Sequence, residues 1–508
     1  MDLAGLPSVL LQEVLFRVAS GATADRVADL LSVCKLFRCE IKKCCVNHAT
    51  HSKSNGDQPL KLQDCAALKS LAVDNRRTSL ITGQGARSGA AVALQALTSL
   101  TVEMSGSVSR EDIWSESTRI IEAAPALAVV VPKNAPNTLF TCLGSLHALT
   151  SLKFSNTWCD GFESGAAFRA LTELLNSIMH LTALQDLQLS CCGCHQLPNS
   201  IGRLTALQML SLAGSDLDEL PDSIGKLAAL QTLDLSTCHR LKGMPDSIGQ
   251  MTALTKLDLD CQDKLILFGS LKGLPDSIGQ LAALEILRLG GQIHLVGLPD
   301  CIGHLTALRV LNLSRCHGLV ALPDSIGHLT ALQTLDLSRC VHIALLPNSI
   351  GHLTALQMLD LSQCCGLVRL PDSIGQMTAL TMLDLSCELH TIRRASITRL
   401  PDSIGQLAAL KILRLCSQDK LALLPDSIRH LTALRTLDLS RCYSLVGLPD
   451  SIGHLTALQT LNLSRCGQIG LLPDSIRYLA ALEIDENIRS DDRYDYLFRG
   501  SFEPSDSE

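Results

Sequence analysis

The chain has 508 residues, of which 46% are hydrophobic and 18% are charged, and its formal net charge is −7 at pH 7. This mildly acidic balance excludes the broad basic footprint of a protein that binds nucleic acid or an anionic membrane surface. The longest apolar run, 126–131, is far shorter than the ~20 residues of a membrane-spanning helix. Because the first residues also lack a secretory signal pattern, we expect a soluble, cytoplasmic protein, with nuclear or cytoskeletal association left open.

Residues 1–46 differ from the rest of the chain and predict two short helices. The segment LPSVLLQEVLFRVA, which starts at Leu6, places leucines and valines on one helical face behind a proline that favours a helix start. The segment VADLLSVCKLFRCEI, which starts at Val27, has the pattern of a second apolar helix. We therefore expect a small all-α N-terminal module.

This module resembles an F-box. The LP start of that family can be laid on Leu6 and Pro7, its L-L-x-E-[IV]-L core on Leu11 to Leu15, and its L-x-x-V-C-[KR]-x-[WF] ending on 30–37. The resemblance implies a Skp1-like adaptor of a ubiquitin ligase as partner. The residues that would meet this adaptor are Pro7, Leu11, Val14, Leu15, Val33 and Cys34.

Two departures from the F-box pattern leave an alternative open. The loop 19–25 is longer than usual and lacks the customary proline, and Phe37 stands where tryptophan is commoner. The alternative is a helical cap that covers the first repeat of the following array.

Two further segments precede the regular part of the chain. Residues 47–60 are polar and rich in turn-forming residues, which predicts a linker. Residues 61–173 contain irregular leucine-rich repeats, recognisable as LKSLAV at Leu68, LTSLTV at Leu97 and LTSLKF at Leu149.

From 174 to 483 the chain repeats one unit with a period of 24 residues, interrupted by one step of 23 and two of 30. A fixed period in this range, built on L-x-x-L-x-L, is the signature of a leucine-rich repeat solenoid. The prolines that mark the repeats are Pro198, Pro221, Pro245, Pro275, Pro299, Pro323, Pro347, Pro371, Pro401, Pro425, Pro449 and Pro473.

The unit 322–345 predicts the fold of each repeat. Leu335 and Leu337 alternate with polar residues, so a short strand buries its leucines and lines the concave face. After Pro323 we expect a short helical turn on the convex face, with the side chains of Asp324 and Ser325 capping its free N–H groups. The expected fold class is therefore α/β: a solenoid of parallel strands and short helical turns, joined to the all-α module.

This array resembles the intracellular leucine-rich repeats of the form LPxSIGxLxxLxxLDLSxC found in plant and animal proteins. Such repeats occur in Ras-group-related and SHOC2-like scaffolds and in plant disease-resistance proteins. The resemblance implies a protein partner and names no ligand.

Three rows of side chains are predicted on the concave face, one residue per repeat. An apolar row contains Met358 and Met382, an acidic row contains Asp336, Asp360 and Asp384, and a basic row completes the surface. The basic row consists of Arg315, Arg339, Arg441 and Arg465. Because adjacent strands lie ~4.8 Å apart, the aspartates would repel one another unless arginines or a basic partner compensate them.

A duplication of 126 residues, visible where QMTALT recurs at Gln250 and Gln376, leaves open whether these rows were selected or copied. Both copies contain an insertion, 261–274 and 387–400, which we expect to carry specificity. The first insertion holds Phe268. The second holds Arg393, Arg394 and Ser396, a spacing that basophilic kinases recognise.

The 21 cysteines do not predict a disulfide framework, because seven of them occupy one repeat position directly after the strand. There we expect free thiols that act as small buried groups and weak donors. The cluster Cys191, Cys192, Cys194 and His195 lacks the second ligand pair of a zinc site. We interpret the histidines that stack on the convex face (His304, His328 and His352) as solvated residues.

After 484 the chain becomes acidic, which predicts a partly capping and then disordered tail over 484–508. The sequence shows no catalytic constellation, so we expect no enzyme, cofactor, metal or small-molecule ligand. The leading hypothesis is the substrate-recognition subunit of an SCF-type ubiquitin ligase. The alternative is a scaffold or a signalling or defence regulator that has no ligase.

Overall fold

The computed structural model describes residues 49–51, 70–74, 99–104, 149–156, 176, 178–190, 195–261, 271–387, 397–479 and 481–484. The predicted N-terminal module 1–46 and the tail after 484 lie outside these residues. The chain divides into two compact units, 1–233 and 234–508. No helix in the described part is long and apolar enough to cross a membrane.

The first unit contains parallel strands that pair in chain order. Each of the predicted irregular repeats contributes one strand. The strands are β1 (Ala49–His51), β2 (Ser70–Asp74), β3 (Ser99–Met104), β4 (Ser151–Asn156), β5 (Asp186–Ser190) and β6 (Met209–Ser211), with β7 (Thr232–Asp234) at the end of the unit. Two 3-10 helices follow β5 and β6: η4 (Asn199–Arg203) and η5 (Asp222–Lys226).

The second unit repeats one strand and one 3-10 helix. Its strands are β8 (Lys256–Asp258), β9 (Ile286–Arg288), β10 (Val310–Asn312), β11 (Thr334–Asp336), β12 (Met358–Asp360), β13 (Met382–Asp384), β14 (Ile412–Arg414), β15 (Thr436–Asp438), β16 (Thr460–Asn462) and β17 (Glu483–Ile484). Its helices are η6 (Asp246–Gln250), η7 (Asp276–Gln280), η8 (Asp300–His304), η9 (Asp324–His328), η10 (Asn348–His352), η11 (Asp372–Gln376), η12 (Asp402–Gln406), η13 (Asp426–His430), η14 (Asp450–His454) and η15 (Asp474–Tyr478).

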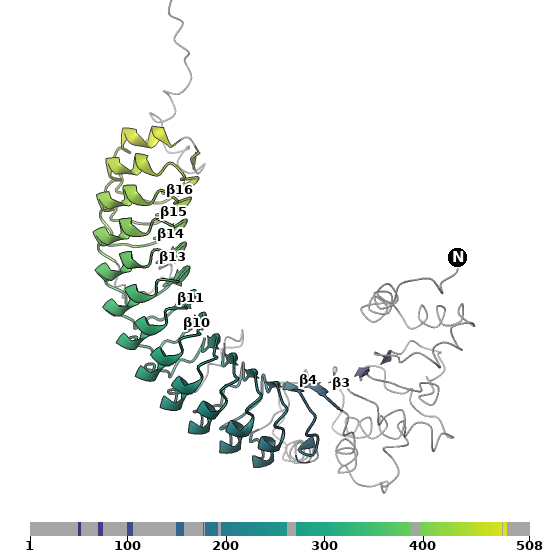
Figure 1. Ribbon diagram of the computed structural model, residues 1–508. Coiled ribbons are helices and arrows are strands. Elements are labelled where there is room, and N and C mark those ends of the chain that lie inside the picture. Colours follow the sequence, from purple (N-terminus) through teal and green to yellow (C-terminus); the bar gives the residue numbers. More distant parts are fainter. Residues whose placement is uncertain are drawn as a thin grey trace, which may run out of the picture. The chain divides into compact units, whose positions relative to one another are not determined.

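The strands of the second unit line its concave face, and the 3-10 helices line the opposite face (Figure 1). We call these the strand face and the helix face. All the strands from β8 to β17 pair in parallel and in register, so that Leu335 lies opposite Leu359 and Asp336 opposite Asp360. The predicted solenoid of parallel strands and short helical turns is confirmed.

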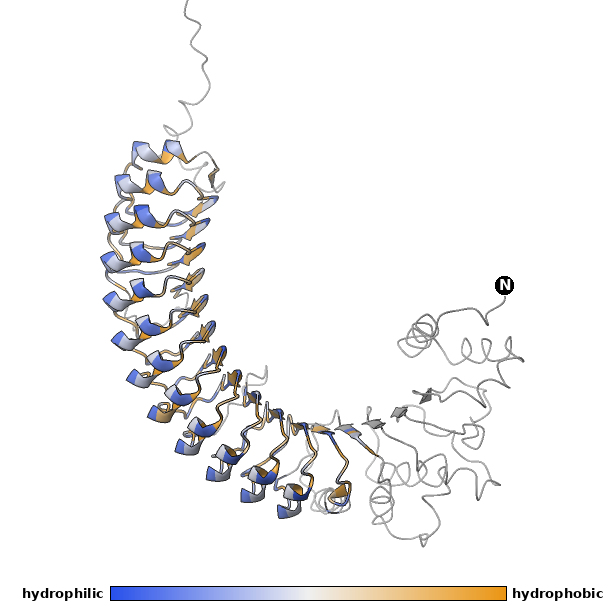
Figure 2. Ribbon diagram, viewed as in Figure 1, coloured by the Kyte–Doolittle hydropathy of each residue, from blue (hydrophilic) through white to orange (hydrophobic). Residues whose placement is uncertain are grey.

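The core is a stack of identical side chains between the two faces. Ile326, Leu329, Leu332, Leu335 and Leu337 of one repeat are all fully buried, and the equivalent residues of the other described repeats are buried as well. Figure 2 shows hydrophobic residues along the strands and on the parts of the helices that turn toward them, with hydrophilic residues on the outer turns. Since one repeat cannot cover its own leucines, its neighbours complete the core.

The predicted capping of the helical turns is wrong. Helix η9 begins after Pro323, without a hydrogen bond from any capping side chain, and Ile326 N–H donates to the Pro323 carbonyl over 3.0 Å. The Ser325 hydroxyl is buried and has no hydrogen-bond partner in the structure. It cannot cap the turn because the serine packs between repeats, against the glycine of the preceding helix. The aspartate side chain stays exposed to solvent.

Two buried glutamines hold the ends of the two insertions. Gln292 donates to the Leu259 carbonyl over 2.7 Å and accepts a hydrogen bond from Leu271 N–H over 3.1 Å. Gln418 donates to the Leu385 carbonyl and accepts from Ile397 N–H over 2.9 Å. In the repeat that follows each insertion, a glutamine occupies the position of the repeat cysteine. Its longer side chain reaches the residues at both ends of the insertion.

The repeat cysteines behave as predicted in the described residues. Their Sγ atoms donate to a leucine carbonyl of the preceding repeat over 2.9–3.2 Å, in Cys316, Cys340, Cys364, Cys442 and Cys466. Burial raises the pKa of the Cys316 thiol to about 12 and that of Cys466 to about 11, so these thiols stay protonated. A disulfide joins two cysteines outside this row, Cys365 and Cys387.

The glycine of the LPxSIG segment allows close stacking of the helices. A Cβ atom at Gly327 would lie 2.5 Å from the Ser349 carbonyl oxygen of the next repeat, whereas a Cβ at Gly297 would meet nothing within 4 Å. At Gly327 a side chain would therefore force the two backbones to shift, whereas at Gly297 there is room for one. Arg429 stands at the equivalent position of η13, so the requirement holds for individual repeats and not for all of them.

We expect Gly327→Ala to destabilise the second unit by about 1–3 kcal/mol, because the added methyl group forces adjacent repeats apart. Thermal unfolding followed by circular dichroism should show a midpoint lowered by roughly 2 °C or more. Gly297→Ala is the matched control and should leave the midpoint unchanged. Equal effects of the two substitutions would contradict the close-stacking argument.

Candidate protein-interaction surface

The strand face presents the first and third residues of each three-residue strand. The first residues form an apolar row whose side chains are half-buried: Ile286, Val310, Met358, Met382 and Ile412. The third residues form the acidic row, which includes the predicted Asp336, Asp360 and Asp384. Because the strands are in register, equivalent residues lie side by side from one repeat to the next, as the spacing of the sequence predicts. Thr334 interrupts the apolar row, and Arg288, Asn312 and Arg414 interrupt the acidic row.

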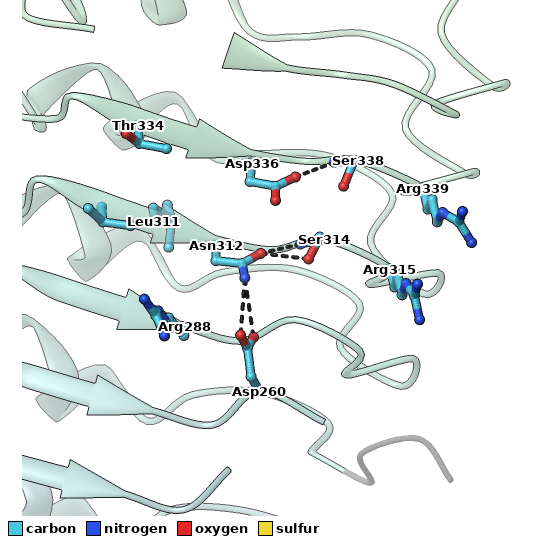
Figure 3. Close-up of a pocket in the computed structure, with 11 residues that line it drawn as sticks. Asp260, Arg288, Leu311, Asn312, Ser314, Arg315, Thr334, Asp336, Ser338 and Arg339 are labelled. Carbon is cyan, nitrogen blue, oxygen red and sulfur yellow. Dashed lines mark hydrogen bonds between the residues drawn. The ribbon is translucent and has the colours of Figure 1, made fainter. Parts of the chain in front are cut away.

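The acidic row also has a structural role that sequence reasoning missed. Asp336 Oδ1 accepts a hydrogen bond from the Ser338 N–H two residues on, over 2.9 Å, and Asp360 and Asp384 accept in the same way. Asn312 makes the same bond to Ser314 (Figure 3). The D/N-x-S spacing was the available signal, since aspartate and asparagine both hydrogen-bond backbone two residues ahead. One oxygen of each carboxylate is thus committed to the turn.

Arginines on neighbouring strands neutralise part of the acidic row. Arg414 Nη1 lies 3.3 Å from Asp384 Oδ2, and Arg288 Nη1 lies 3.4 Å from Asp258 Oδ2. Asp360, between two other aspartates, has no such arginine beside it. Its pKa is raised by burial and also by the charges of Asp336 and Asp384. The predicted repulsion between neighbouring carboxylates therefore acts mainly on Asp360.

The basic row lies in the turns that follow the strands, in a backbone conformation that L-residues seldom adopt. Arg315, Arg339, Arg441 and Arg465 have positive φ values of 59°, 64°, 60° and 63°. This conformation directs the Arg339 N–H to the Ser362 carbonyl of the next repeat over 2.7 Å. Gly291 occupies the same position, with a φ of 76° and an N–H bond of 2.7 Å to Ser314. The turn therefore accepts glycine, which avoids the cost of this conformation.

Neither Arg315 nor Arg339 forms an ion pair with a carboxylate within the described part of the chain. Arg339 is exposed and Arg315 is half-buried. Burial lowers the pKa of the adjacent His317, and the charges of His342, Arg315 and Arg339 lower it further. A positive cluster without ion pairs to described carboxylates thus sits at this edge of the strand face. The positive φ belongs to the turn itself, since Thr237, Gln363 and Ser417 hold it at the same repeat position.

A polar depression of about 450 Å³ lies between the acidic and basic rows over β9, β10 and β11. Figure 3 shows Arg315 and Arg339 extending from the turns after β10 and β11, and Asn312 pointing toward Asp260. Its lining residues are Asp260, Arg288, Val310, Leu311, Asn312, Ser314, Arg315, Thr334, Asp336, Ser338 and Arg339. Both charge signs line this depression, which suits a protein surface better than an apolar ligand.

Asp260 is the most perturbed carboxylate of the depression. It stands where most repeats have serine, and it accepts hydrogen bonds from Gly290 N–H and from Asn312 Nδ2, the latter over 3.2 Å. Burial raises its pKa to about 6, helped by the neighbouring Asp258 charge and opposed by the Gly290 hydrogen bond and by Arg288. This residue makes the charge of the depression depend on pH between about 5 and 7.

The remaining predicted residues fall into two groups. Pro7, Leu11, Val14, Leu15, Val33 and Cys34 are outside the described residues, as are Phe268, Arg393, Arg394 and Ser396 of the insertions. His304, His328 and His352 are exposed on the helix face. Among the described residues, no group of three histidine, cysteine or acidic side chains is arranged to hold a metal ion.

The positive φ of Arg339 predicts that glycine and alanine at this position differ in stability. Arg339→Gly should stabilise the second unit relative to Arg339→Ala by about 1 kcal/mol, because both lose the guanidinium and only glycine relieves the conformation. Denaturant titration of the two variants checks this difference. If the alanine variant is as stable as the glycine variant, the arginine turns are unstrained.

The raised pKa of Asp260 predicts a pH dependence of stability. The folded carboxyl binds its proton up to about pH 6 and the unfolded one only up to about 3.8. Stability from this group is therefore present below pH 4 and is lost as the pH rises toward 6. Replacing Asp260 by the serine of other repeats should stabilise the protein by about 1 kcal/mol at pH 7.5, since partial exposure reduces the effect.

Thermal unfolding of wild type and Asp260→Ser at pH 4.5 and pH 7.5 tests this prediction. The difference between the two midpoints should be larger at pH 7.5. The exposed Asp276 provides the control, because Asp276→Ser should give the same difference at both pH values. A difference for Asp260→Ser that shrinks at the higher pH would show that the carboxylate stabilises the fold.

Comparison with known proteins identifies the repeats. A leucine-rich repeat region model matches residues 172–268 and 299–400, and a leucine-rich repeat model matches residues 433–455 and 457–479. No curated protein sequence matches the chain. Among solved structures, a leucine-rich repeat protein of Leptospira interrogans is 27% identical, over 70% of this chain and 93% of its own, with a TM-score of 0.40.

Two further solved structures are similar to this chain. Toll of Drosophila, in the Toll–Spatzle complex, is 17% identical over 86% of this chain, which spans 56% of the Toll chain; the TM-score is 0.58. The functional domain of InlJ from Listeria monocytogenes, described as including a cysteine ladder, is 17% identical over 78% of this chain and 72% of its own, with a TM-score of 0.40. The likeness to Toll extends to the fold alone.

Proposed function

Because the chain is a leucine-rich repeat protein, and such repeats are protein-interaction modules, we propose that its strand face binds a client protein for an SCF-type ubiquitin ligase. The observation that carries the client site is the pair Arg315 and Arg339. Neither forms an ion pair with a carboxylate among the described residues, and both line the polar depression. Guanidinium groups placed there can pair with acidic groups of a partner.

The chemistry of the strand face specifies the client further. Acidic groups of the client would pair with Arg315 and Arg339, and basic groups with the free carboxylate oxygens of Asp336 and Asp360. The methionines Met358 and Met382 offer an adaptable apolar contact in the first row. These parallel rows favour a folded protein surface or an extended segment that crosses several repeats.

The ligase part of the proposal rests on the N-terminal sequence. The F-box-like residues Pro7, Leu11, Val14 and Leu15 would bind a Skp1-like adaptor, while the repeats hold the client. The chain would then act by proximity, since it brings a client to the ligase and performs no chemistry itself. This agrees with the generally non-enzymatic character of leucine-rich repeat scaffolds.

A second function uses the same surface without a ligase. In a scaffold or a signalling or defence regulator, the strand face would join two proteins and residues 1–46 would cap the first repeat. The long loop 19–25 and Phe37 favour this function, because both depart from the F-box pattern.

Two variants of the full-length chain separate the adaptor from the client. Affinity purification with a Skp1–cullin preparation and cell extract should show that Leu11→Asp with Val14→Asp loses the adaptor and keeps the client proteins. Arg315→Glu with Arg339→Glu should lose the client proteins and keep the adaptor, because a reversed charge repels acidic groups.

The exposed Arg435 supplies the control, and Arg435→Glu should retain both kinds of partner. Absence of the adaptor from the wild-type purification, with the protein folded, would favour the scaffold function. Clients that remain bound to the arginine variant would place their binding site away from the strand face.

A further inference from the structure

The exposed large hydrophobic side chains of the second unit gather at one place in the repeat. Of the nine such residues in the described part of the chain, seven lie two or three positions before the proline that precedes a 3-10 helix. We call them the apolar ridge: Val296, Val320, Leu345, Val368, Leu423, Val446 and Leu471. Their exposed fractions run from 44% for Val368 to 77% for Leu471.

Backbone hydrogen bonds align the ridge. The segment that leads from each strand turn to the next 3-10 helix bonds to the same segment of the preceding repeat. Val320 N–H donates to the Val296 carbonyl over 3.2 Å, and Val446 N–H donates to the Ala422 carbonyl over 3.1 Å. Hydrogen-bonded segments lie ~4.8 Å apart. Four ridge residues stand three positions before the proline and three stand two positions before it, and the repeat of Pro401 contributes none.

The fold does not require apolar residues at these positions. In the same segment Leu319 and Leu322 already fill the core, with exposed fractions of 0% and 6%. In two earlier repeats the equivalent positions hold Lys242 and Lys272, both exposed. Since lysine serves the same backbone, packing within the chain does not explain the valines and leucines from 296 onward, and contiguous exposed apolar surface of this kind marks interaction sites.

A row of aspartates borders the ridge. Each 3-10 helix from η8 onward, except η10, begins with an exposed aspartate, and none of these side chains caps its helix. The aspartate row consists of Asp300, Asp324, Asp372, Asp402, Asp426, Asp450 and Asp474. Only three or four residues of extended chain separate a ridge residue from its aspartate, roughly 10–14 Å. Asp426 accepts a hydrogen bond from Ser451 Oγ over 3.4 Å, and Asp474 lies 3.8 Å from Arg477 Nη2. The carboxylates of Asp324 and Asp372 are exposed to solvent and can meet a partner.

We infer that the apolar ridge and the aspartate row together bind a basic amphipathic segment of a partner protein. An amphipathic helix laid along the ridge repeats every 5.4 Å, close to the spacing of the repeats, so its leucine-like residues would meet the ridge. Its lysines or arginines would meet the aspartates. The two arginines at ridge positions, Arg369 and Arg399, are outnumbered by the seven aspartates, so an acidic segment is disfavoured.

A second copy of the chain is a weaker candidate for this surface. A two-fold contact places the same patch on both sides, so the aspartate rows of the two copies would face the same narrow contact. Like charges in an interface oppose association. A basic segment neutralises the row instead.

The inference is tested with a labelled peptide of about 18 residues, five helical turns, made of leucine and lysine at amphipathic spacing. Fluorescence anisotropy should show that the full-length protein binds this peptide at least tenfold more tightly than a leucine–glutamate peptide of the same pattern. Val320→Ser with Leu345→Ser and Val368→Ser should weaken binding at least fivefold, as should Asp324→Asn with Asp372→Asn. These residues are exposed, so both variants should fold.

The control variant changes the equivalent helix aspartates of the two repeats that carry Lys242 and Lys272 in place of a ridge residue. Asp246→Asn with Asp276→Asn should bind the leucine–lysine peptide as tightly as wild type. Equal binding of the two peptides, or full binding by the ridge variant, would overturn the inference. Sedimentation that shows dimers in wild type and monomers in the ridge variant would also overturn it, because a second copy would then cover the ridge.

Discussion

The structure depends on the in-register pairing of parallel strands between adjacent repeats. Each leucine of a strand lies opposite the same leucine of the next strand. Backbone N–H groups donate to carbonyls of the adjacent repeat, as Leu337 N–H does to the Asp360 carbonyl over 2.8 Å. This constraint fixes the core, because identical side chains stack at identical depth. It also fixes the surface: any residue type that recurs in the repeat becomes a row about 5 Å in period. The strand face, the aspartate row and the apolar ridge all follow from it.

Many polar residues of the repeat divide their hydrogen-bonding capacity between fold and surface. Each aspartate of the acidic row accepts a hydrogen bond from the following turn with one carboxylate oxygen, and Asp384 also pairs with Arg414 through the other. The cysteines commit their thiols to neighbouring carbonyls and stay protonated through burial. The arginines of the turns differ, because Arg315 and Arg339 form no ion pair with a carboxylate in the described part and line the polar depression.

The duplicated segments have diverged beside the strand face. Asp260 in the first copy corresponds to Ser386 in the second, 126 residues on. Cys261 is free and hydrogen-bonded to Gln292, whereas its counterpart Cys387 is bonded to Cys365. Arg315 and Arg339 keep arginine in both copies, at Arg441 and Arg465. Both copies therefore carry the arginine turns, and only one of them has an aspartate at the position of Asp260.

The sequence by itself determined the repeat, its strand register and its core, because a leucine at a fixed place in a fixed period can be buried only by its neighbours. It also determined the membership of the rows at Asp336 and Arg339. Only the tertiary structure decided what those rows do. Capping by Asp324 and Ser325 was a sound local expectation, yet stacking on the preceding glycine removed the serine from the turn. The strain of the arginine turns, the raised pKa of Asp260 and the exposure of the apolar ridge depend on contacts between repeats, which the pattern within one repeat does not contain.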